Sequence, residues 1–460
     1  MVDSDDFAPM TSAYEALKNR WLGLVANAGK QMTTKRIFFS VGEPSGDLHA
    51  SNLILDLDRK ASRAGLQLKC FGFGGPKMAG VGCELLEDLT QHAVMFLSGV
   101  ISKIAKFRQL LRDADQVFAK GEVDVVVLID YSGFNWLVAK RAHRFGIPVV
   151  FYGIPQMWAW APWRVRKMRK FVTLGLCKLP FEKKWLEDRH CQAEYVGHPF
   201  FDEMQRQEID VEFVNRFRQE HLAGEDTDAD LVTILPGSRT QEIRSNLPAL
   251  LRTAKRVKES RPETRFVVSC LNREQQQLAE SVAEEAGLAK IAMMDGNRTP
   301  ELIHLAKCCL ACSGSVSLEL MYREKPTIIH YKLPRHLFLL QKLFLRVKYI
   351  TLVNLLWSQT ISRNGMSVYD PDSSKAEPVP FPEYLTTSDK SVEMSSQLIK
   401  LLENRNAFQQ KVGMLQDLKR NFGHPGASEH AAGVICDRFL SPSSEHGSTD
   451  DRQPSRISVA

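Results

Sequence analysis

The chain has 460 residues, more than a single hydrophobic core usually supports, so we expect two domains of about 150 to 200 residues. Apolar residues make up 44% and charged residues 25%, a balance that excludes a generally disordered chain. The formal net charge of +6, from 60 basic and 54 acidic residues, is too small to indicate a dedicated nucleic-acid-binding protein.

Residues 1–34 precede the first predicted strand and are interpreted as an N-terminal extension. The extension has acidic residues at its start and no basic region followed by an apolar run, so neither a signal peptide nor a transit peptide is expected. No apolar stretch reaches the roughly 20 residues that a membrane-spanning helix needs. These features predict a soluble or peripheral protein.

The first half of the chain alternates short β-branched or aromatic runs with helical patterns. The predicted strands are residues 36–41, 68–74, 124–130, 148–153 and 172–179. Strand and helix in alternation predict a parallel sheet with right-handed crossovers. We therefore expect a Rossmann-like domain over residues 35–204.

The same pattern restarts after a charged helical connection. The predicted strands of the second half are residues 231–239, 265–271, 290–294, 308–315 and 327–333. They predict a second Rossmann-like domain over residues 205–360. The fold class is therefore α/β, with two doubly wound domains facing each other across a cleft. Ligands of such sheets bind beyond the carboxyl ends of the strands.

Three segments complete the predicted organisation. Residues 361–387, rich in Pro, Ser and Asp, are expected to form a loop or insertion. Residues 388–440 are expected to be helices that pack back on the N-terminal domain. The polar residues 441–460 are expected to be a disordered tail.

The nine cysteines are odd in number and scattered through apolar runs, as expected for reduced thiols in the cytosol. Cys309 and Cys312 form a CxxC pair, but no second pair follows at the spacing of a zinc site. The stretch around them is typical of a buried strand. We expect no metal site there.

Carboxylates follow two of the predicted strands of the first half. Glu43 and Asp47 lie in a Gly- and Ser-containing turn, and Asp130 ends the run 124–130. A carboxylate at a strand end faces the predicted cleft and is rigidly placed for acid–base chemistry. The alternative is structural, because Asp47 and Asp130 would also serve as caps of the helices that follow.

The second half has two turns suited to a nucleotide diphosphate. Gly237, Ser238 and Arg239 close one strand, and Arg239 is able to make charge-assisted bonds to a diphosphate. The turn Ser313, Gly314 and Ser315 opens a helix whose free amides favour an anion. Glu319, one turn into that helix, is suited to accept bonds from two ribose hydroxyls. Together the two turns favour a nucleotide site over chance helix capping.

The order of motifs resembles the lipid-A-disaccharide synthase family, whose members have the GT-B fold. The matching segments, over roughly residues 35 to 438, are GEPSGDLHA, GGPKMAGVGC, AVMFLSGV, LID followed by FN, PQMWAW, LPFE, VGHP, LPGSR, SGSVSLE and YK, with weaker matches at LVNLL, PEYL and GASEHAA. The sequence departs from the family at Gly133, where an acidic residue is usual, and in the long segment before PEYL.

The resemblance implies transfer of 2,3-diacylglucosamine from UDP to 2,3-diacylglucosamine 1-phosphate, with inversion, a β-1′,6 linkage and release of UDP. It also implies that the acceptor side of the cleft is lined by Glu43, Asp47 and Asp130. By the same resemblance, the donor is held by Arg239, Ser315 and Glu319. We expect no cofactor and no catalytic metal, because amides, a helix dipole and cationic side chains neutralise the departing diphosphate. Asp130 is our preferred general base, with His49, His198 and Glu43 as rivals.

Diacylated substrates require an apolar entrance, so we expect peripheral association with the inner face of the cytoplasmic membrane. Two basic, apolar segments are candidates for docking: a helical stripe of Leu97, Val100, Ile101, Ile104, Phe107 and Leu111, and residues 337–350. Burial in the core is the alternative for each. Oligomeric state stays open. Two alternative functions also stay open. One is another UDP-sugar enzyme, such as a 2-epimerase or a transferase with a different lipid acceptor. The other is a non-catalytic nucleotide- or lipid-binding protein.

Overall fold

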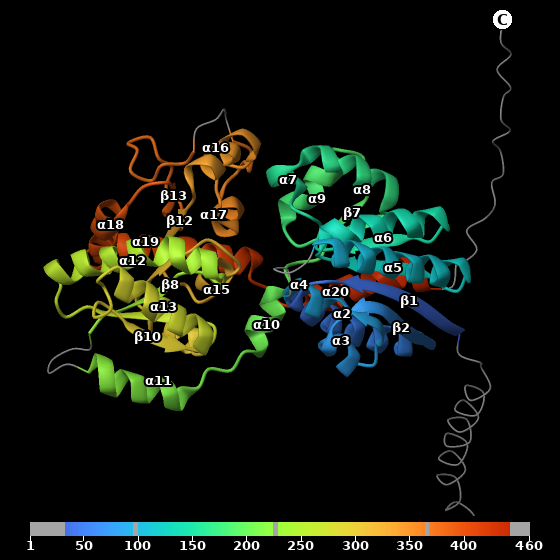
Figure 1. Cartoon of the computed structure of the whole chain (residues 1–460), viewed down its shortest axis with the longest axis horizontal. Helices are drawn as coiled ribbons and strands as arrows, with labels where there is room; N and C mark the ends of the chain where they lie inside the picture. Colours follow the sequence, from blue (N-terminus) through green and yellow to red (C-terminus); the bar gives the residue numbers. More distant parts are fainter. Residues whose placement is uncertain (1–32, 95–99, 224–228, 364–367, 442–460) are drawn as a thin grey trace, which may run out of the picture. The chain divides into compact units, whose positions relative to one another are not determined.

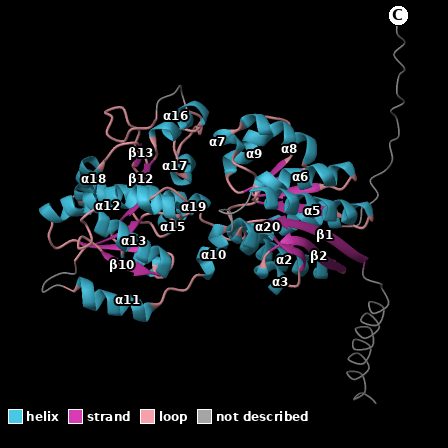
Figure 2. Ribbon diagram, viewed as in Figure 1, coloured by secondary structure: helices cyan, strands magenta, loops and turns pink. Residues whose placement is uncertain are grey.

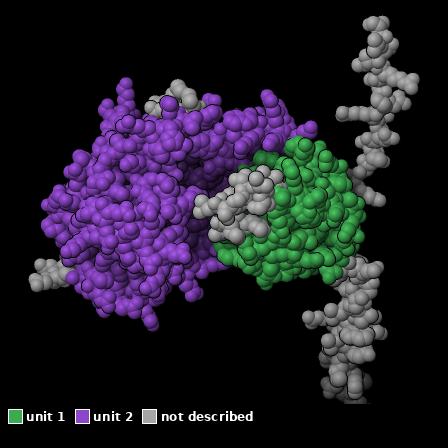
Figure 3. Space-filling model, viewed as in Figure 1, with its two compact units in different colours: residues 1–152, 171–173, 428–460 green, residues 153–170, 174–427 purple. Residues whose placement is uncertain are grey.

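The computed structural model describes residues 33–94, 100–223, 229–363 and 368–441. Most of the predicted N-terminal extension and nearly all of the predicted C-terminal tail therefore lie outside the described residues. The chain divides into two compact units (Figure 3). Unit 1 contains residues up to 152, residues 171–173 and residues from 428, and unit 2 contains residues 153–170 and 174–427.

The first sheet has seven strands in the order β3-β2-β1-β4-β5-β6-β7. Its strands are β1 (Thr33–Val41), β2 (Leu66–Gly74), β3 (Glu84–Asp88), β4 (Val125–Ile129), β5 (Val149–Tyr152), β6 (Leu174–Cys177) and β7 (Ala193–Tyr195). All five predicted strands are present. The central strand β4 is buried along its whole length, as its unbroken apolar run indicates for a strand covered on both faces.

Helices follow these strands in alternation, as predicted (Figures 1 and 2). They are α2 (Pro44–Arg63), α3 (Pro76–Gly80), α4 (Leu89–Val94), α5 (Val100–Ala119), α6 (Ser132–Arg144), α7 (Met157–Trp160), the short 3-10 helix Pro162–Arg164, α8 (Val165–Phe171) and α9 (Pro180–Glu187). The alternation confirms the doubly wound arrangement of the first half.

The second sheet has six strands in the order β10-β9-β8-β11-β12-β13. They are β8 (Leu231–Leu235), β9 (Arg265–Cys270), β10 (Met293–Gly296), β11 (Cys308–Ala311), β12 (Thr327–Lys332) and β13 (Glu383–Thr386). The prediction of a loop over residues 361–387 is wrong at its end, because β13 pairs with β12 there. The nine cysteines are all free and buried, and Cys309 lies in β11 as predicted.

The remaining helices belong to the second half of the chain and to its C-terminal part. They are α10 (Phe200–Arg206), α11 (Val211–Phe217), the π-helix η2 (Arg218–Leu222), α12 (Thr240–Ser260), α13 (Arg273–Glu285), α14 (Thr299–Leu305), α15 (Val316–Tyr322), α16 (Arg335–Phe344), α17 (Leu352–Trp357), α18 (Ser391–Glu403), α19 (Arg405–Phe422), α20 (Ala427–Ile435) and the π-helix η3 (Cys436–Leu440). Within the described residues, no helix is both long enough and apolar enough to cross a bilayer.

The compact units differ from the predicted division between residues 204 and 205. The two sheets do separate along the chain between β7 and β8. However, Trp158 and Leu179 share a core cluster with Leu345, Val347 and Tyr349, so the segment around α7 and α9 belongs to unit 2. Packing between distant segments overrides the boundary suggested by strand order.

The C-terminal helices also differ from their prediction. In unit 2, α18 packs against α12 and α19 against α15. Only the last part of the chain packs in unit 1, where η3 contacts α2. Residues from 428 onward therefore pack with the N-terminal part of the chain, as predicted for residues 388–440, but the rest of that helical segment does not.

Candidate active site

The strand order of the first sheet brings the predicted carboxylate segments together. Strands β1 and β4 are neighbours at the point where the sheet order reverses, which is where doubly wound sheets bind ligands. Glu43 follows β1 and Asp130 follows β4. Between them lies Gly46, where an added Cβ would stand 3.5 Å from the Asp130 Oδ2 atom. The first turn of α2, which follows β1, is therefore packed against the Asp130 carboxylate.

Asp130 and Tyr131 are both held in the left-handed backbone region, with φ of 48° and 37°. Such conformations cost non-glycine residues roughly 1 to 2 kcal/mol each and persist only where the surroundings hold them. Tyr131, and not Asp130, occupies the N-cap position of α6. The strained turn fixes the direction of the Asp130 side chain at the end of β4.

The residue that holds this turn is Asn135, which is fully buried. Its Nδ2 donates to the carbonyls of Ser40 at 3.1 Å, Ile129 at 3.2 Å and Asp130 at 2.9 Å. Its Oδ1 accepts from the Ser40 hydroxyl at 2.7 Å. Asn135 thus joins the ends of β1 and β4. In the sequence, Asn135 is recognisable only as part of the family motif LID followed by FN.

Glu43 lies within electrostatic reach of the Tyr131 hydroxyl. Burial raises the pKa of Tyr131, and the Glu43 charge raises it further. The Tyr131 ring also fills the space beside Gly42, where a Cβ would approach it to 2.3 Å. Glu43, Tyr131 and Asp130 therefore form one group at the sheet edge.

Asp47 has a different environment from the one predicted. It is not the N-cap of α2, a position that Glu43 occupies. Its buried carboxylate accepts hydrogen bonds from the amides of Gly75 at 3.1 Å, Lys77 at 2.9 Å and Met78 at 3.1 Å, at the start of α3. Because both oxygens bind backbone amides, the geometry favours a positioning role for Asp47.

The two histidine rivals for the general base lie in separate units. His49 is buried within α2 of unit 1. His198 belongs to unit 2, where its Nδ1 accepts a hydrogen bond from the Phe200 amide at 3.2 Å. Of the candidates, Asp130 lies at the reversal point of the first sheet, directly after the central strand.

The second sheet has its own reversal point between β8 and β11. The turn after β8 is held by Glu242, whose Oε2 accepts from the amides of Ser238 at 3.0 Å and Arg239 at 3.2 Å. Glu242 Oε1 pairs with the Arg239 guanidinium at 3.0 Å. The Arg239 side chain is nevertheless 79% exposed and thus accessible to an anion. Gly237 has a φ of 113° and leaves no room for a Cβ beside Glu242.

The turn after β11 lies beside the first one, because β8 and β11 pair. The Ser313 hydroxyl donates to the Ile350 carbonyl at 3.3 Å, and Ser315 is the N-cap of α15. Glu319 is buried, and its Oε1 pairs with Arg323 at 2.9 Å. Burial raises the pKa of Glu319, and Arg323 opposes that rise. The predicted donor residues therefore gather at one edge of the second sheet.

Sequence reasoning missed Glu383, which supports this edge. Its buried carboxyl accepts from the amides of Ile350 at 2.7 Å and Thr351 at 3.1 Å, and from Asn354 Nδ2 at 3.0 Å. Burial raises the pKa of Glu383 to about 7. Since Ile350 binds Ser313, Glu383 helps to fix the turn after β11. The glutamate in the PEYL motif was the available signal.

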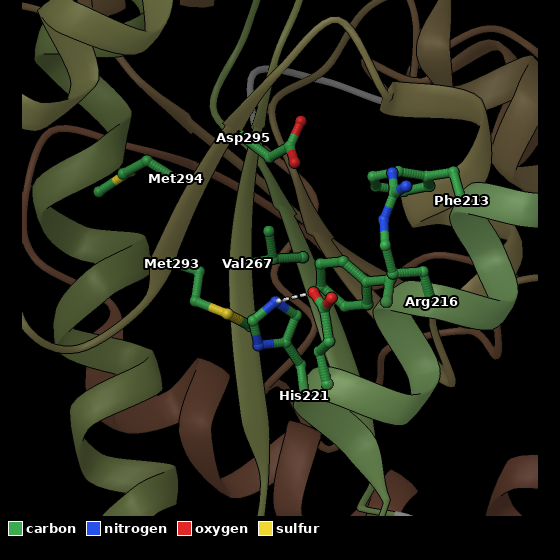
Figure 4. A pocket seen from close by; sticks show the side chains of 9 residues that line it. Phe213, Arg216, His221, Val267, Met293, Met294 and Asp295 are labelled. Carbon is green, nitrogen blue, oxygen red and sulfur yellow. Dashed lines mark ion pairs between the residues drawn. The ribbon is translucent and has the colours of Figure 1, made fainter.

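A cavity of about 360 Å³ lies elsewhere in unit 2 (Figure 4). Its lining comes from α11, η2, β9 and β10, and Figure 4 shows Phe213, Met293 and His221 around it. None of the predicted donor residues lines it. The candidate donor site is thus the strand-end turns and not this cavity.

Gly133, in the first turn of α6, yields a stability prediction. An added Cβ would meet no atom within 4 Å there, and φ is not positive. Gly133→Asp should stabilise the fold by about 1 kcal/mol, because it removes a flexible residue and places a negative charge at a helix N-terminus. Urea unfolding measures the change, and Gly133→Ala isolates the backbone contribution. A lower unfolding midpoint for both variants would contradict the inference that a side chain fits at this position without a clash.

Two doubly wound parallel sheets with polar turns at their reversal points define the GT-B class of fold. Solved structures agree. The UDP-GlcNAc 2-epimerase from Neisseria meningitidis bound to UDP-GlcNAc aligns with a TM-score of 0.54 and 11% identity, over 88% of this chain and all of its own. The calicheamicin glycosyltransferase CalG4 aligns with a TM-score of 0.50 and 11% identity, over 89% of this chain and all of its own. At such identities they show the fold alone.

The sequence comparisons identify the family. The model of the lipid-A-disaccharide synthetase family matches residues 37–412. A lipid-A-disaccharide synthase from Myxococcus xanthus (strain DK1622) is 33% identical over 321 residues, 70% of this chain and 81% of that protein. One from Coxiella burnetii (strain CbuG_Q212) is 28% identical over 415 residues, 89% of this chain and 100% of that protein. The chain belongs to the lipid-A-disaccharide synthase family, a family of glycosyltransferases.

Proposed function

We propose that the enzyme transfers 2,3-diacylglucosamine from UDP to the 6-hydroxyl of 2,3-diacylglucosamine 1-phosphate. The observation that carries the proposal is the exposed Arg239 guanidinium, which Glu242 holds beside the Ser313–Ser315 turn at two neighbouring strand ends. A guanidinium with two parallel N–H donors, next to the backbone amides at a helix start, suits the diphosphate of a nucleotide sugar. The epimerase alternative has the support of the fold alone.

In the donor site, Arg239 and the amides of the Ser313–Ser315 turn neutralise the diphosphate as it departs. Gly237 and Ser238 form the turn that Glu242 holds, Ser313 and Gly314 contribute backbone, and Ser315 begins α15. The second carboxylate oxygen of Glu319 is the acceptor for ribose hydroxyls. These groups supply the stabilisation that a metal ion would otherwise give, so we predict activity in the presence of a chelator.

In the acceptor site, Asp130 removes the proton from the acceptor's 6-hydroxyl. That oxygen forms a bond to the anomeric carbon as the bond from that carbon to the UDP oxygen breaks, and UDP leaves with the electron pair. One base and one displacement invert the anomeric configuration. The partly buried strand end favours proton transfer by restricting water. Glu43 lies nearby as a second acidic group, and Asp47 positions the turn before α3.

The reaction is tested by incubating the purified chain with UDP-2,3-diacylglucosamine and 2,3-diacylglucosamine 1-phosphate. Mass spectrometry should detect a tetraacyl disaccharide monophosphate, and NMR should show a β-1′,6 linkage. Release of a free 2-epimerised sugar without disaccharide would favour the epimerase alternative. Binding of UDP without turnover of any lipid acceptor would favour a non-catalytic protein.

The acylated substrates call for a surface that contacts lipid, and α16 provides one. Its side chains Leu337, Leu339, Leu340 and Phe344 are between 43% and 62% exposed. Leu337, Leu340 and Phe344 recur at the spacing of one helical face, and Arg335 and His336 are exposed at its start. We propose that this helix, shown in orange in Figure 1, docks on the cytoplasmic face of the inner membrane.

The other docking candidate is only partly described. Leu97 lies outside the described residues, as do the side chains of Val100, Ile101 and Ile104. Phe107 packs against Phe134 with ring centroids 5.3 Å apart, and Leu111 is buried. The described end of that stripe therefore belongs to the core.

Replacing both Leu339 and Leu340 with Ser should weaken binding to anionic vesicles by roughly 10- to 100-fold, because two exposed apolar side chains no longer enter the bilayer. Sedimentation with phosphatidylglycerol vesicles measures the bound fraction. Ser substitutions at Leu55 and Val392, which are also exposed, are the matched control. If α16 and control variants bind vesicles equally well, α16 is not the docking surface.

A further inference from the structure

Tyr331 lies level with the two donor turns. Leu235 of β8 pairs with Ala311 of β11, and Ala311 pairs with Ile329 of β12. Two residues further along these three strands come Gly237, Ser313 and Tyr331. The register therefore places Tyr331 at the same height on the sheet as the proposed diphosphate site.

The alternation of side chains along the strands places Tyr331 on the α15 face of the sheet. Leu235, Ala311 and Ile329 belong to the core cluster that contains Leu318 and Leu320 of α15. Their immediate neighbours in sequence, such as Leu310 and Ile328, belong to the opposite cluster beneath α12. Since successive strand residues point to opposite faces, Tyr331 follows Ile329 and shares the face of α15.

The Tyr331 side chain is half-buried, and within the described part of the chain its hydroxyl makes no hydrogen bond and its ring no ring contact. Burial raises the pKa of Tyr331, Cys312 and Glu242 raise it further, and Arg239 opposes them. The hydroxyl is thus within electrostatic reach of both residues that form the turn after β8. A half-buried hydroxyl without a partner points to a ligand that supplies one.

On the opposite face, the buried residue Asn246 of α12 fixes this end of β12. Its Oδ1 accepts from the Lys332 amide at 2.8 Å and contacts His330 Nδ1 at 3.1 Å, so that nitrogen carries the proton. Its Nδ2 donates to the Glu242 carbonyl at 2.8 Å and lies 3.6 Å from Cys312 Sγ. One side chain therefore ties β12 to Glu242, which holds the turn after β8, and to Cys312, which precedes the turn after β11.

We propose that Tyr331 is a further donor-binding residue whose hydroxyl donates a hydrogen bond to the diphosphate beside Arg239, and that Asn246 positions it from the opposite face of the sheet. This assignment rests on the proposed placement of UDP. Tyr331 contacts the ligand, whereas Asn246 acts only through the end of β12.

Tyr331→Phe removes one hydroxyl and keeps the ring. Loss of a hydrogen bond to a charged group should raise the Kd for UDP by about 10-fold or more, as measured by calorimetry. Uridine, which has no phosphate, should bind with unchanged affinity in ligand-observed NMR. Tyr369→Phe is the control for loss of a tyrosine hydroxyl, because the Tyr369 hydroxyl donates to the Glu377 carbonyl and not to a residue of either turn.

Asn246→Ala should weaken UDP binding through the same contact. In the double variant with Tyr331→Phe, the Kd should not exceed that of the weaker-binding single variant, because both changes remove one interaction. Thr253→Ala is the control for general damage to α12, since the buried Thr253 hydroxyl donates to the Ala249 carbonyl within that helix. Fully additive losses would overturn the positioning role of Asn246.

The outcomes separate this inference from the proposed function. If Tyr331→Phe binds UDP normally while Arg239→Ala does not, the Tyr331 assignment is overturned and the donor site stands. If uridine and UDP lose affinity equally, the hydroxyl contacts the nucleoside and the diphosphate assignment is overturned. If UDP binds normally to both Tyr331→Phe and Arg239→Ala, the proposed donor site itself is wrong.

Discussion

Asp130→Asn is expected to lower kcat by about 10² to 10⁴ while UDP affinity stays at the wild-type value. The amide has the shape of the carboxylate but cannot take the proton from the acceptor hydroxyl. Asn also tolerates the left-handed backbone at this position, where φ is 48°. The loss should therefore arise from chemistry and not from refolding of the turn. Steady-state kinetics with the lipid acceptor and calorimetry with UDP provide the two measurements.

Asp58→Asn, an exposed aspartate on α2 of the same unit, is the control and should retain normal turnover. Glu43→Gln and His49→Ala test the rival bases under identical conditions. Near-normal turnover in Asp130→Asn, together with a large defect in one of these variants, would transfer the role of general base to that residue.

Arg239→Ala is expected to reduce kcat/KM by about 30- to 1,000-fold, equivalent to a loss of about 2 to 4 kcal/mol of transition-state stabilisation. The guanidinium binds the donor and also neutralises the charge that develops on the leaving diphosphate. Both the KM for the donor and kcat should therefore change. Arg239→Lys should recover part of the loss, because it keeps the charge without the planar fork.

Arg244→Ala is the matched control, because Arg244 is an exposed arginine on the same helix as the capping residue Glu242. It should change kcat/KM by less than about two-fold at moderate ionic strength, where exposed charges are screened. An Arg239→Ala variant with unaltered kcat/KM would remove Arg239 from the donor site.

The fold was largely predictable because the buried strands are short apolar runs bounded by turns. All ten predicted strands are present. The three missed strands, β3, β7 and β13, have the sequences ELLED, AEY and EYLT, which are short and partly polar. All three lie at an edge of their sheet, and each contains a glutamate that interrupts the apolar run.

The candidate site was predictable to the level of strand ends but not to the level of individual contacts. Asp47 and Asp130 looked alike in sequence, as carboxylates after a predicted strand. In the structure, the Asp47 carboxylate accepts hydrogen bonds from three backbone amides at the start of α3. Asp130 instead lies in a strained turn that Asn135 holds. That distinction depends on residues 28 to 31 positions away from Asp47, and no local pattern encodes it.

The compact units depart from the predicted domain boundary for the same reason. The run of strands predicted a division after residue 204, but Trp158 packs with residues some 190 positions later, such as Tyr349. Long-range packing of aromatic side chains leaves little periodic signal in a single sequence. The sheet order, which depends on local patterns and short crossovers, was easier to anticipate.

Backbone hydrogen exchange with and without UDP tests the central claim most directly, since that claim places the donor nucleotide at the ends of β8, β11 and β12. UDP should slow exchange in residues 236–242, 313–319 and 331–332, with no change around Phe213 and Met293, which line the cavity of Figure 4. The same protection should be lost in Arg239→Ala at equal UDP concentration. Protection confined to that cavity or to the strand ends of the first sheet, with none near Arg239, would contradict the account.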